Sequence, residues 1–428
     1  MATRAAAEWI SSVLKWLTPR RLRAQAIVLV FCLWGVCVVD FATPGLFDRA
    51  GNIKFQDFLP FYVSARLMAH HRAIDIYDQN VQLRELQSIV GPTQVEIPYL
   101  YGPQVALLFV PFTRLSFATA AWMWSSISVL MYFACIHAVW KRCQSLSQGA
   151  PSLPPFSREK WGFALATLAF PPLFHVFVRG QVSVLILVCF TLAFLAFNNN
   201  RPALAGIALG FLMMKPPFLI AISLVLLFAG AWRSFAGLAV SAMAQLVFAR
   251  FYFGGAVMRA YLELMLRPDR WINATELSLA PIQMHSLRSF WALLIPLPIA
   301  AFALYILTSV IVIVVTIAIW RSHLPLSLRY SGLILSSVLV NPHLFVYDLL
   351  VLTPALLLIV DWCLTNEQAA LRSELFVFSY LAFILPLFGP VSRWTHLQFS
   401  VIAFIALLWT LFCFTRISAL ASTKSPVV

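Results

Sequence analysis

The sequence predicts an all-α, polytopic integral membrane protein. Three observations lead to this class: 61% of the 428 residues are hydrophobic, only 11% are charged, and the apolar residues gather in long runs. Soluble globular domains have about 45–50% apolar and about 25% charged residues. The composition therefore excludes a soluble enzyme, a disordered chain and a secreted disulfide scaffold. We expect the whole chain, 1–428, to form a single transmembrane domain.

The cysteines and the net charge of +14 exclude further classes of protein. The seven cysteines lie in or beside apolar runs, without a CxxC or Cys/His pair, so neither a disulfide framework nor a zinc site is indicated. An excess of Lys and Arg suits nucleic acid or an anionic membrane surface. Nucleic-acid binders carry these residues on a soluble face, and no soluble domain is predicted here. We expect membrane lipids as partners, and no nucleic acid.

About twelve transmembrane helices are predicted, within a range of eleven to thirteen, because a helix needs about 20 apolar residues to cross the hydrocarbon. In chain order the expected spans are 24–41, 117–140, 161–178, 181–197, 202–214, 217–231, 234–253, 290–320, 330–340, 344–360, 375–388 and 394–414. Several are short, and corners such as Lys215-Pro216-Pro217 indicate paired helices that turn near the surface. The segment 104–114 is too short to span and is expected to be re-entrant or interfacial.

The distribution of Lys and Arg between the loops predicts the orientation of the chain. The segments expected in the cytoplasm are the basic N-terminus, 141–160, Arg201, Arg233, 321–329, 362–374 and the C-terminus. The opposite side then holds a first outer loop, 42–116, with interfacial helices, and a second outer loop, 255–289. We expect a multi-pass protein of the plasma or inner membrane of the cell.

Six polar clusters fall at helix ends on the non-cytoplasmic side. They are Asp57, Tyr101-Gly102-Pro103, Arg179-Gly180-Gln181, Lys215-Pro216, the loop 255–289, and Asn341-Pro342-His343 with Tyr347-Asp348. Polar groups at membrane depth are costly and are usually functional. Their convergence on one side predicts a single site there.

A polar helix with one aromatic face is expected near the start of the first outer loop. Phe58, Phe61, Tyr62 and Ala65 recur at the spacing of one helix face. The segment is too short and too polar to cross the membrane. We therefore expect it to lie in the interface plane with this face in lipid, which places Asp57 at its amino end, just above the membrane.

Asp57 has two compatible interpretations. It is an N-cap, with Pro60 tolerated in the first turn, or it is a carboxylate that takes a proton from an incoming hydroxyl. An ionised aspartate suits the second role at neutral pH. The basic residues Lys54 and Arg66 are expected to help to keep it charged.

Other polar residues of the first outer loop are expected to be structural. Asp78 precedes a second polar helix, 79–90, and is expected to cap it. His70 and His71 are expected to be solvated or interfacial. The chain has no DxD pair in this loop, and the spacing of Asp75 and Asp78 does not resemble a metal site, so we expect no metal ion.

Two polar corners between helices could bind an anion. In Arg179-Gly180-Gln181 the glycine permits a tight turn, and its neighbours supply donors at the amino end of the next helix, where anions are favoured. The alternative is a simple turn with a snorkelling arginine. Lys215, held by two prolines, either snorkels or offers a compact charge to a phosphate.

The segment Asn341-Pro342-His343 interrupts the apolar run between two spans, and Tyr347-Asp348 follows. His343 is either a hydrogen-bonded side chain or a chemical group. His343 and Tyr347 are four residues apart and can share a helix face, whereas His343 and Asp348 are five apart and cannot.

The second outer loop combines basic and aromatic residues. They are Arg259, Tyr261, Arg267, Arg270, Trp271 and Arg288. This mixture suits a lipid-phosphate head group, and it equally suits a solvated loop.

Several motifs, taken in order, resemble glycosyltransferase family 87. They are Asp57-Phe-x-x-Phe61-Tyr62-x-Ser-Ala65, Tyr77-Asp78, Tyr101-x-Pro103 with Pro111 and Trp122, Gly180-Gln181, Gly206-x-x-x-Gly210 before Lys215-Pro216, and Asn341-Pro342-His343 with Tyr347-Asp348. The resemblance extends from about residue 55 to about residue 360. The chain departs from the family pattern at His70-His71-Arg72, where a glycine is expected, and at Gly102, where a second proline is expected.

The resemblance implies the C-type glycosyltransferase fold, that of polytopic helical enzymes that use polyprenyl-phosphate sugars at the outer face of the membrane. It implies that Asp57 is the general base of an inverting transfer of a hexose to a hydroxyl of a lipid or glycan acceptor. It also implies that Lys215, Arg179 and His343 lie near the donor phosphate. Known members include mannosyltransferases of lipid glycans, which favours mannose. No cofactor is expected, because the lipid-linked sugar is itself a substrate.

Nine residues are predicted to bind substrate around the catalytic Asp57. They are Tyr62, Arg66, Tyr101, Arg179, Gln181, Lys215, Arg288, His343 and Tyr347. Two other functions stay open. Many spans and short proline-broken helices also suit a translocase of polyprenyl-sugars or lipids without catalysis, and a non-catalytic membrane subunit is the third class. Arg250 is the one candidate for an ionisable residue near the middle of a span, and no repeat relates the two halves of the chain, which disfavours a transporter.

Overall fold

The computed structural model describes residues 2–93, 97–148, 160–266, 281–366 and 368–423. Helices make up 81% of the structure, and no strand forms within these ranges. The all-α class is therefore confirmed. The apolar helices described next make the chain a membrane-embedded protein.

Within the described ranges, seven helices are long and apolar enough to cross a membrane. They are α2 (Pro19–Phe41), α6 (Phe117–Trp140), α14 (Trp232–Leu266), α17 (Pro298–Arg321), η7 with α19 (Val346–Thr365), α20 with η8 and α21 (Arg372–Thr395), and α22, which covers Phe399–Thr423. The helices α9 (Lys160–Leu168) and α10 (Pro171–Arg179) form one further span if they are counted together across a bend of 56°.

Four shorter apolar helical segments complete this set. They are α11 (Ser183–Asn198), α12 with η4 (Pro202–Met214), η5 with α13 (Pro216–Phe228) and α18 (Leu326–Val340). The count of twelve spans stays a prediction, because it requires the bent pair and all four shorter segments to cross.

Prolines and a glycine place several helix ends differently from the predicted ones. The predicted span 161–178 is broken before Pro171, because proline cannot continue a helix without losing a hydrogen bond. The predicted span 290–320 is divided in the same way into α16 (Leu287–Leu294) and α17, which begins at Pro298. The predicted span 234–253 ends at Gly254, whose φ is +85°, but helical residues continue to Leu266. An N-terminal helix, α1 (Ala2–Trp16), was not predicted.

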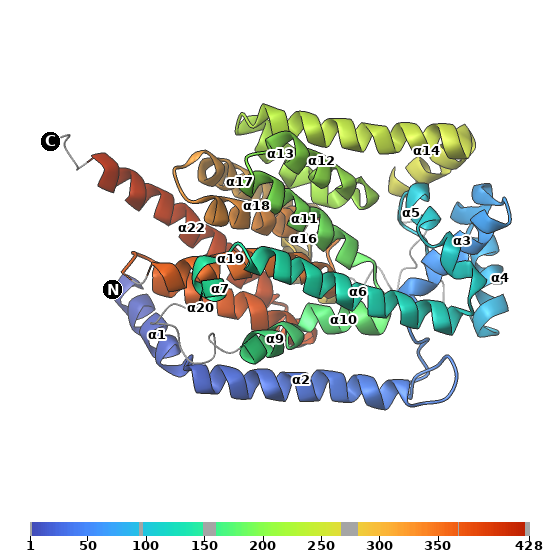
Figure 1. The fold of residues 1–428 in the computed structure, drawn as a ribbon, viewed down its shortest axis with the longest axis horizontal. Coiled ribbons are helices and arrows are strands. Elements are labelled where there is room, and N and C mark those ends of the chain that lie inside the picture. The colour runs from blue at the N-terminus through green and yellow to red at the C-terminus, as the bar shows by residue number, and fades with distance from the viewer. Residues whose placement is uncertain (1, 94–96, 149–159, 267–280, 367, 424–428) are drawn as a thin grey trace.

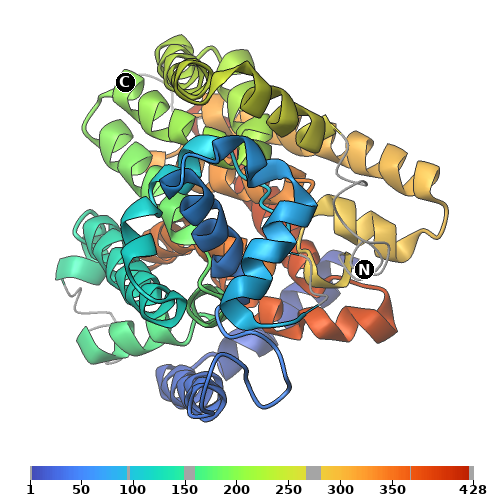
Figure 2. The ribbon, with the colours of Figure 1, turned by 90° about the vertical axis from the view of Figure 1, so that its right-hand side faces the viewer.

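The long helices α2, α6 and α14 run along one axis of the molecule (Figure 1). The start of α1 and the end of α22 lie at one end, together with the short helix α7 (Gln144–Gln148). The helices of the first outer loop, α3 (Leu59–Ala69), α4 (Gln79–Val90) and α5 (Pro103–Leu107), gather at the other end. Seen from that end, they lie across the middle of the bundle (Figure 2). The start of α1 and the end of α22 are therefore at the opposite end from the first outer loop.

The first outer loop is packed into the bundle. Its expected amphipathic helix is α3, but the expectation of an aromatic face in lipid was wrong: Phe58, Phe61, Tyr62 and Ala65 are all buried inside the protein. The reason is a set of aromatic partners on later segments. The Phe58 ring lies 5.6 Å from Phe109 and 6.2 Å from Phe117.

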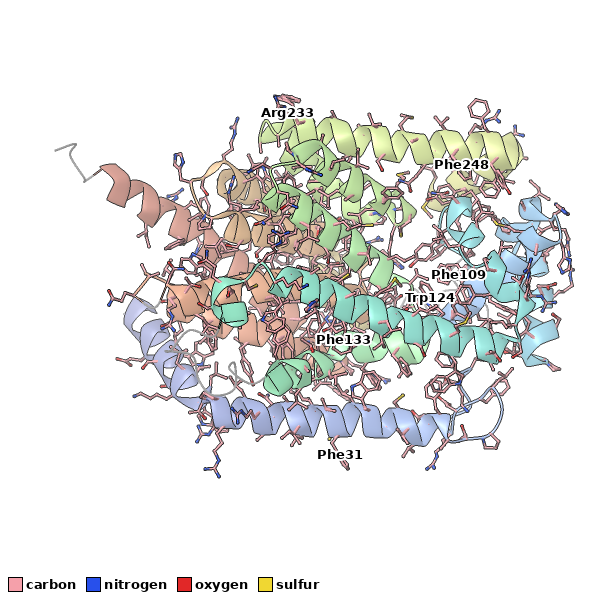
Figure 3. All side chains as sticks on the ribbon, viewed as in Figure 1. Phe31, Phe109, Trp124, Phe133, Arg233 and Phe248 are labelled. Carbon is pink, nitrogen blue, oxygen red and sulfur yellow. The ribbon has the colours of Figure 1, made fainter. Side chains whose placement is uncertain are left out.

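Figure 3 shows the contrast between buried rings of the first outer loop and an outward-facing ring of α2. Phe109, from the first outer loop, and Trp124, from α6, contact each other edge to face with ring centroids 4.8 Å apart. Phe31, on α2, points away from the bundle and is 78% exposed. The aromatic rings of the first outer loop thus join the core, whereas Phe31 of α2 faces the surroundings.

Two glycines allow α12 (Pro202–Gly210) to pack closely on α14. A Cβ at Gly206 would collide with the carbonyl oxygen of Ser234, and one at Gly237 would collide with that of Ala203. Small residues at helix contacts let backbones approach closely in membranes. This contact fixes the segment that leads to Lys215.

We predict that Gly206→Ala destabilises the fold by about 1–3 kcal/mol, because the added methyl group overpacks a backbone contact. Thermal unfolding in detergent measures the effect. Gly35→Ala on α2 is the matched control, since nothing lies within 4 Å of its added Cβ. Equal unfolding midpoints for the two variants would contradict the packing argument.

Candidate active site

Asp57 lies in the one-turn helix η1 (Gln56–Phe58), which leads directly into α3. Its side chain is 14% exposed. Neither η1 nor α3 has a side-chain cap, so the carboxylate is not the N-cap that one interpretation expected. Asp78, by contrast, caps α4 by accepting from the backbone N–H groups of Asn80 and Val81, as predicted.

The partners of the Asp57 carboxylate come from the corner between α10 and α11. The Gln181 amide donates its Nε2–H to Oδ2 at 3.1 Å. The Arg179 guanidinium lies 3.6 Å from Oδ1. The amide of Gln181 is itself oriented, because its Oε1 accepts from the backbone N–H of Val182 at 3.0 Å. Asp57 is therefore held by side chains more than one hundred residues away in the sequence.

Gly180 makes this contact possible. It ends α10 in the left-handed region, with φ of +70°, and the N–H groups of Gly180 and Gln181 donate back to the carbonyls of Phe177 and Val176. This is a common way for a helix to end. A Cβ at Gly180 would lie 2.7 Å from the Cβ of Phe58. A glycine is thus needed both for the turn and for the approach of η1.

The cations expected to support Asp57 from its own loop are engaged elsewhere. The Lys54 ammonium donates to the carbonyls of Phe41, Thr43 and Gly45. Arg66 forms an ion pair with Glu85 at 3.1 Å. That expectation was wrong: the cations whose charges act on Asp57 are Arg179 and Lys215.

Lys215 forms a buried ion pair with Asp348. Its Nζ lies 2.6 and 2.7 Å from the two carboxylate oxygens, and the Asp348 side chain is fully buried. The Ser183 hydroxyl donates to Oδ1 of Asp348 at 2.7 Å, and the backbone N–H of Phe345 donates to Oδ2 at 3.2 Å. The pair therefore joins the end of η4, the start of α11 and η7 (Val346–Val351).

Two tyrosine rings lie beside the Lys215 ammonium. The Nζ atom is 5.8 Å from the ring centroid of Tyr101 and 5.5 Å from that of Tyr347. These distances allow an attraction between the cation and the ring faces. The Tyr101 backbone is fixed in turn, because its carbonyl accepts from the Tyr77 hydroxyl at 2.7 Å.

The electrostatics confirm that the two carboxylates share one region. Burial raises the pKa of Asp57 above its ordinary value, while Arg179, the hydrogen bond from Gln181 and Lys215 oppose that rise. Burial also raises the pKa of Tyr101 well above its ordinary value, and the charges of Asp348 and Asp57 both contribute.

His343 lies at the edge of this cluster. Burial and, to a smaller extent, the nearby charges of Lys215 and Arg288 lower its pKa to about 4, while the charge of Asp348 opposes the shift. The imidazole is therefore neutral at neutral pH. Its ring contacts Phe345 edge to face at 4.8 Å. Arg288, at the start of α16, is exposed.

Most predicted site residues gather around Asp57, and two do not. Tyr101, Arg179, Gln181, Lys215 and Tyr347 surround it, with His343 and Arg288 beside them. Tyr62 instead donates its hydroxyl to the carbonyl of Leu115 at 2.6 Å, and Arg66 pairs with Glu85. The predicted residues Arg267, Arg270 and Trp271 lie outside the described residues.

Two residues of the cluster, Asp348 and Ser183, are missing from the predicted site. Asp348 carried a usable signal, because an ionisable residue in an apolar segment usually has a partner and a function. Its partner Lys215 lies 133 residues earlier in the chain, so the spacing of Asp348 from His343 along one helix does not indicate this pair. Ser183 gave no signal that distinguishes it from the other serines of apolar helices. Within the described residues, no group of three or more His, Cys, Asp or Glu side chains could hold a metal ion.

Comparison with known proteins identifies a family. The model of glycosyltransferase family 87 matches residues 99–342. The matched segment contains Tyr101, Arg179, Gln181, Lys215 and Arg288, and Asp57 and Asp348 lie outside it. No curated protein and no solved structure matches the chain.

We predict that Gly180→Ala destabilises the protein more than Gly230→Ala does. Both glycines end a helix with the same pair of backbone hydrogen bonds and a positive φ, so both variants carry a strain of about 1–2 kcal/mol. Only at Gly180 does the added Cβ also collide with a neighbour, Phe58. Thermal unfolding of the two variants in detergent measures the difference. Equal losses of stability would show that η1 moves away from the added Cβ at little cost in free energy.

Proposed function

The chain belongs to glycosyltransferase family 87, and on that premise we propose that it transfers a hexose from a polyprenyl-phosphate donor to a hydroxyl of a lipid or glycan acceptor, with Asp57 as the general base. The family and the apolar helices make the protein a membrane glycosyltransferase. One observation carries the finer proposal: a partly exposed carboxylate, held by distant side chains, lies beside two cations at one end of the bundle.

The proposed reaction is an inverting displacement. Asp57 accepts the proton of the acceptor hydroxyl while the hydroxyl oxygen forms a bond to the anomeric carbon of the sugar. The bond from that carbon to the phosphate oxygen breaks, and the polyprenyl phosphate leaves with the electron pair. Because phosphate is a good leaving group, the protein needs one base and a set of cations, and it needs no acid.

The accessible donors of the cluster suit the developing charge on the phosphate. Arg179 is 41% exposed, Arg288 is exposed and His343 is half-buried. Fixed donors aimed at developing charge are usually the largest contribution to catalysis in such sites. We assign these three residues to the donor phosphate. Mannose is the proposed sugar.

We place the site on the non-cytoplasmic side of the plasma or inner membrane. The first outer loop lies at the opposite end of the bundle from the junction of α1 and α2 (Figure 1), and the basic residues Lys15, Arg20 and Arg21 belong to the end of α1 and the start of α2. The rule that basic segments stay in the cytoplasm then assigns Asp57 to the opposite side.

We predict that Asp57→Asn lowers the rate of sugar transfer by about 10²–10⁴-fold, because an amide cannot accept the proton. A product assay with a radiolabelled polyprenyl-phosphate sugar measures the loss. Asp75→Asn is the control, since Asp75 forms only a partly exposed pair with Arg72 in the same loop. Full activity of Asp57→Asn would refute the role of this carboxylate. Movement of the donor across vesicles without any product would favour the translocase instead.

We also predict the direction of the pH dependence. Because the pKa of Asp57 is raised, the ionised base is lost as the pH falls through a midpoint above 3.8, the ordinary value for aspartate. The acid limb of kcat/KM reports this midpoint for the free enzyme. Arg179→Gln removes the cation that most opposes the rise and moves the midpoint further up. A wild-type midpoint at or below 3.8, with activity recovered on return to neutral pH, would contradict the prediction.

A further inference from the structure

The two ion pairs of the cluster differ in tightness. Arg179 lies 3.6 Å from Asp57, and its side chain is 41% exposed. Lys215 lies 2.6 Å from Asp348, and the two side chains are 9% and 0% exposed. The first pair is open to substrate, and the second is closed. Arg179 is therefore accessible to a phosphate, whereas Lys215 is buried against Asp348. The sequence had predicted that both lie near the donor phosphate.

We propose that Asp348 is a positioning residue of the transfer reaction, which fixes the Lys215 ammonium between Tyr101 and Tyr347 and offsets part of its charge at Asp57. This inference rests on the proposed function of Asp57 as the base. Asp348 itself acts through Lys215 and is not assigned a contact with substrate.

The contacts of Asp348 support the positioning role. Both of its oxygens are used, one by Ser183 and Lys215 and the other by Lys215 and the backbone N–H of Phe345. Ser183 follows Gln181 by two residues, and Gln181 holds Asp57. The start of α11 thus anchors both carboxylates of the cluster, which fixes the position of one relative to the other.

The charges of the cluster support the second part of the proposal. The groups that act on Asp57 or share its surroundings are the cations Arg179 and Lys215, the carboxylate Asp348, and the phenols of Tyr101 and Tyr347. His343 lies beyond them and is neutral at neutral pH. The two cations and the two carboxylates balance. Without Asp348, the full charge of Lys215 would act on Asp57 and make it a weaker base.

A purely structural role for the pair is the competing explanation. Buried ion pairs are weak evidence for stability, and apolar replacements often match them. A structural role predicts a loss of stability and of active enzyme, with an unchanged pH profile. The positioning role predicts a change in the profile itself, so the two explanations are separable.

The test measures the fall of kcat/KM at low pH, its acid limb, in Asp348→Asn. We expect the midpoint of this limb to move to lower pH by about one unit, because an uncompensated cation now favours the ionised Asp57. Asp361→Asn is the matched control. Asp361 is also a buried carboxylate, but it accepts from the backbone N–H groups of Gln144, Ser145 and Leu146 at the opposite end of the bundle. The control is expected to lose stability without any shift of the limb. An unshifted limb in Asp348→Asn would overturn the proposal.

A second pair of variants keeps the test decisive if Asp348→Asn does not fold. Lys215→Gln should move the limb up, because it removes a cation and leaves the Asp348 charge. The double variant Lys215→Gln with Asp348→Asn should return the limb toward the wild-type position, because both charges are gone. If the midpoint of the acid limb is the same in the double variant as in Lys215→Gln, the proposal is overturned. Activity retained in Asp57→Asn would instead refute the proposed function.

Discussion

The buried ion pair between Lys215 and Asp348 joins three segments that are far apart in the sequence. Charges removed from water require partners for every oxygen and proton, and here those partners come from η4, α11 and η7. The requirement fixes where the three segments meet. Tyr101 and Tyr347 then pack beside the ammonium, and the corner at Gly180 brings Arg179 and Gln181 to Asp57. The geometry around Asp57, the candidate base, therefore follows from the need to give the buried charges of Lys215 and Asp348 partners inside an apolar bundle.

The aromatic packing of the first outer loop supplies the other half of that geometry. Phe58 is surrounded by the rings of Tyr62, Phe109, Phe112, Phe117 and Trp124, and it contacts the turn at Gly180. Because Phe58 is the residue after Asp57, the burial of its ring sets the position of the carboxylate. A polar residue at the edge of the bundle is thus placed by apolar contacts of its neighbour as well as by its own polar partners.

The sequence predicted the helix class, many span positions, α4 with its cap Asp78, and the convergence of polar clusters, because composition and periodicity report these features directly. It did not predict the burial of α3, since an amphipathic stripe has the same spacing whether it faces lipid or other rings. It did not predict the partner of Lys215 either. An ion pair between residues 215 and 348 depends on how helices pack, and no local pattern records that arrangement. The assignment of Lys54 and Arg66 to Asp57 failed for the same reason.

The position of the chain ends constrains how the polypeptide is threaded. The start of α1 and the end of α22 lie at the same end of the bundle (Figure 1). A path that begins and finishes on one side must traverse the layer an even number of times. The seven long helices among the described residues are odd in number. Either one of them does not cross the layer, or the bent pair or a shorter apolar helix supplies a further passage.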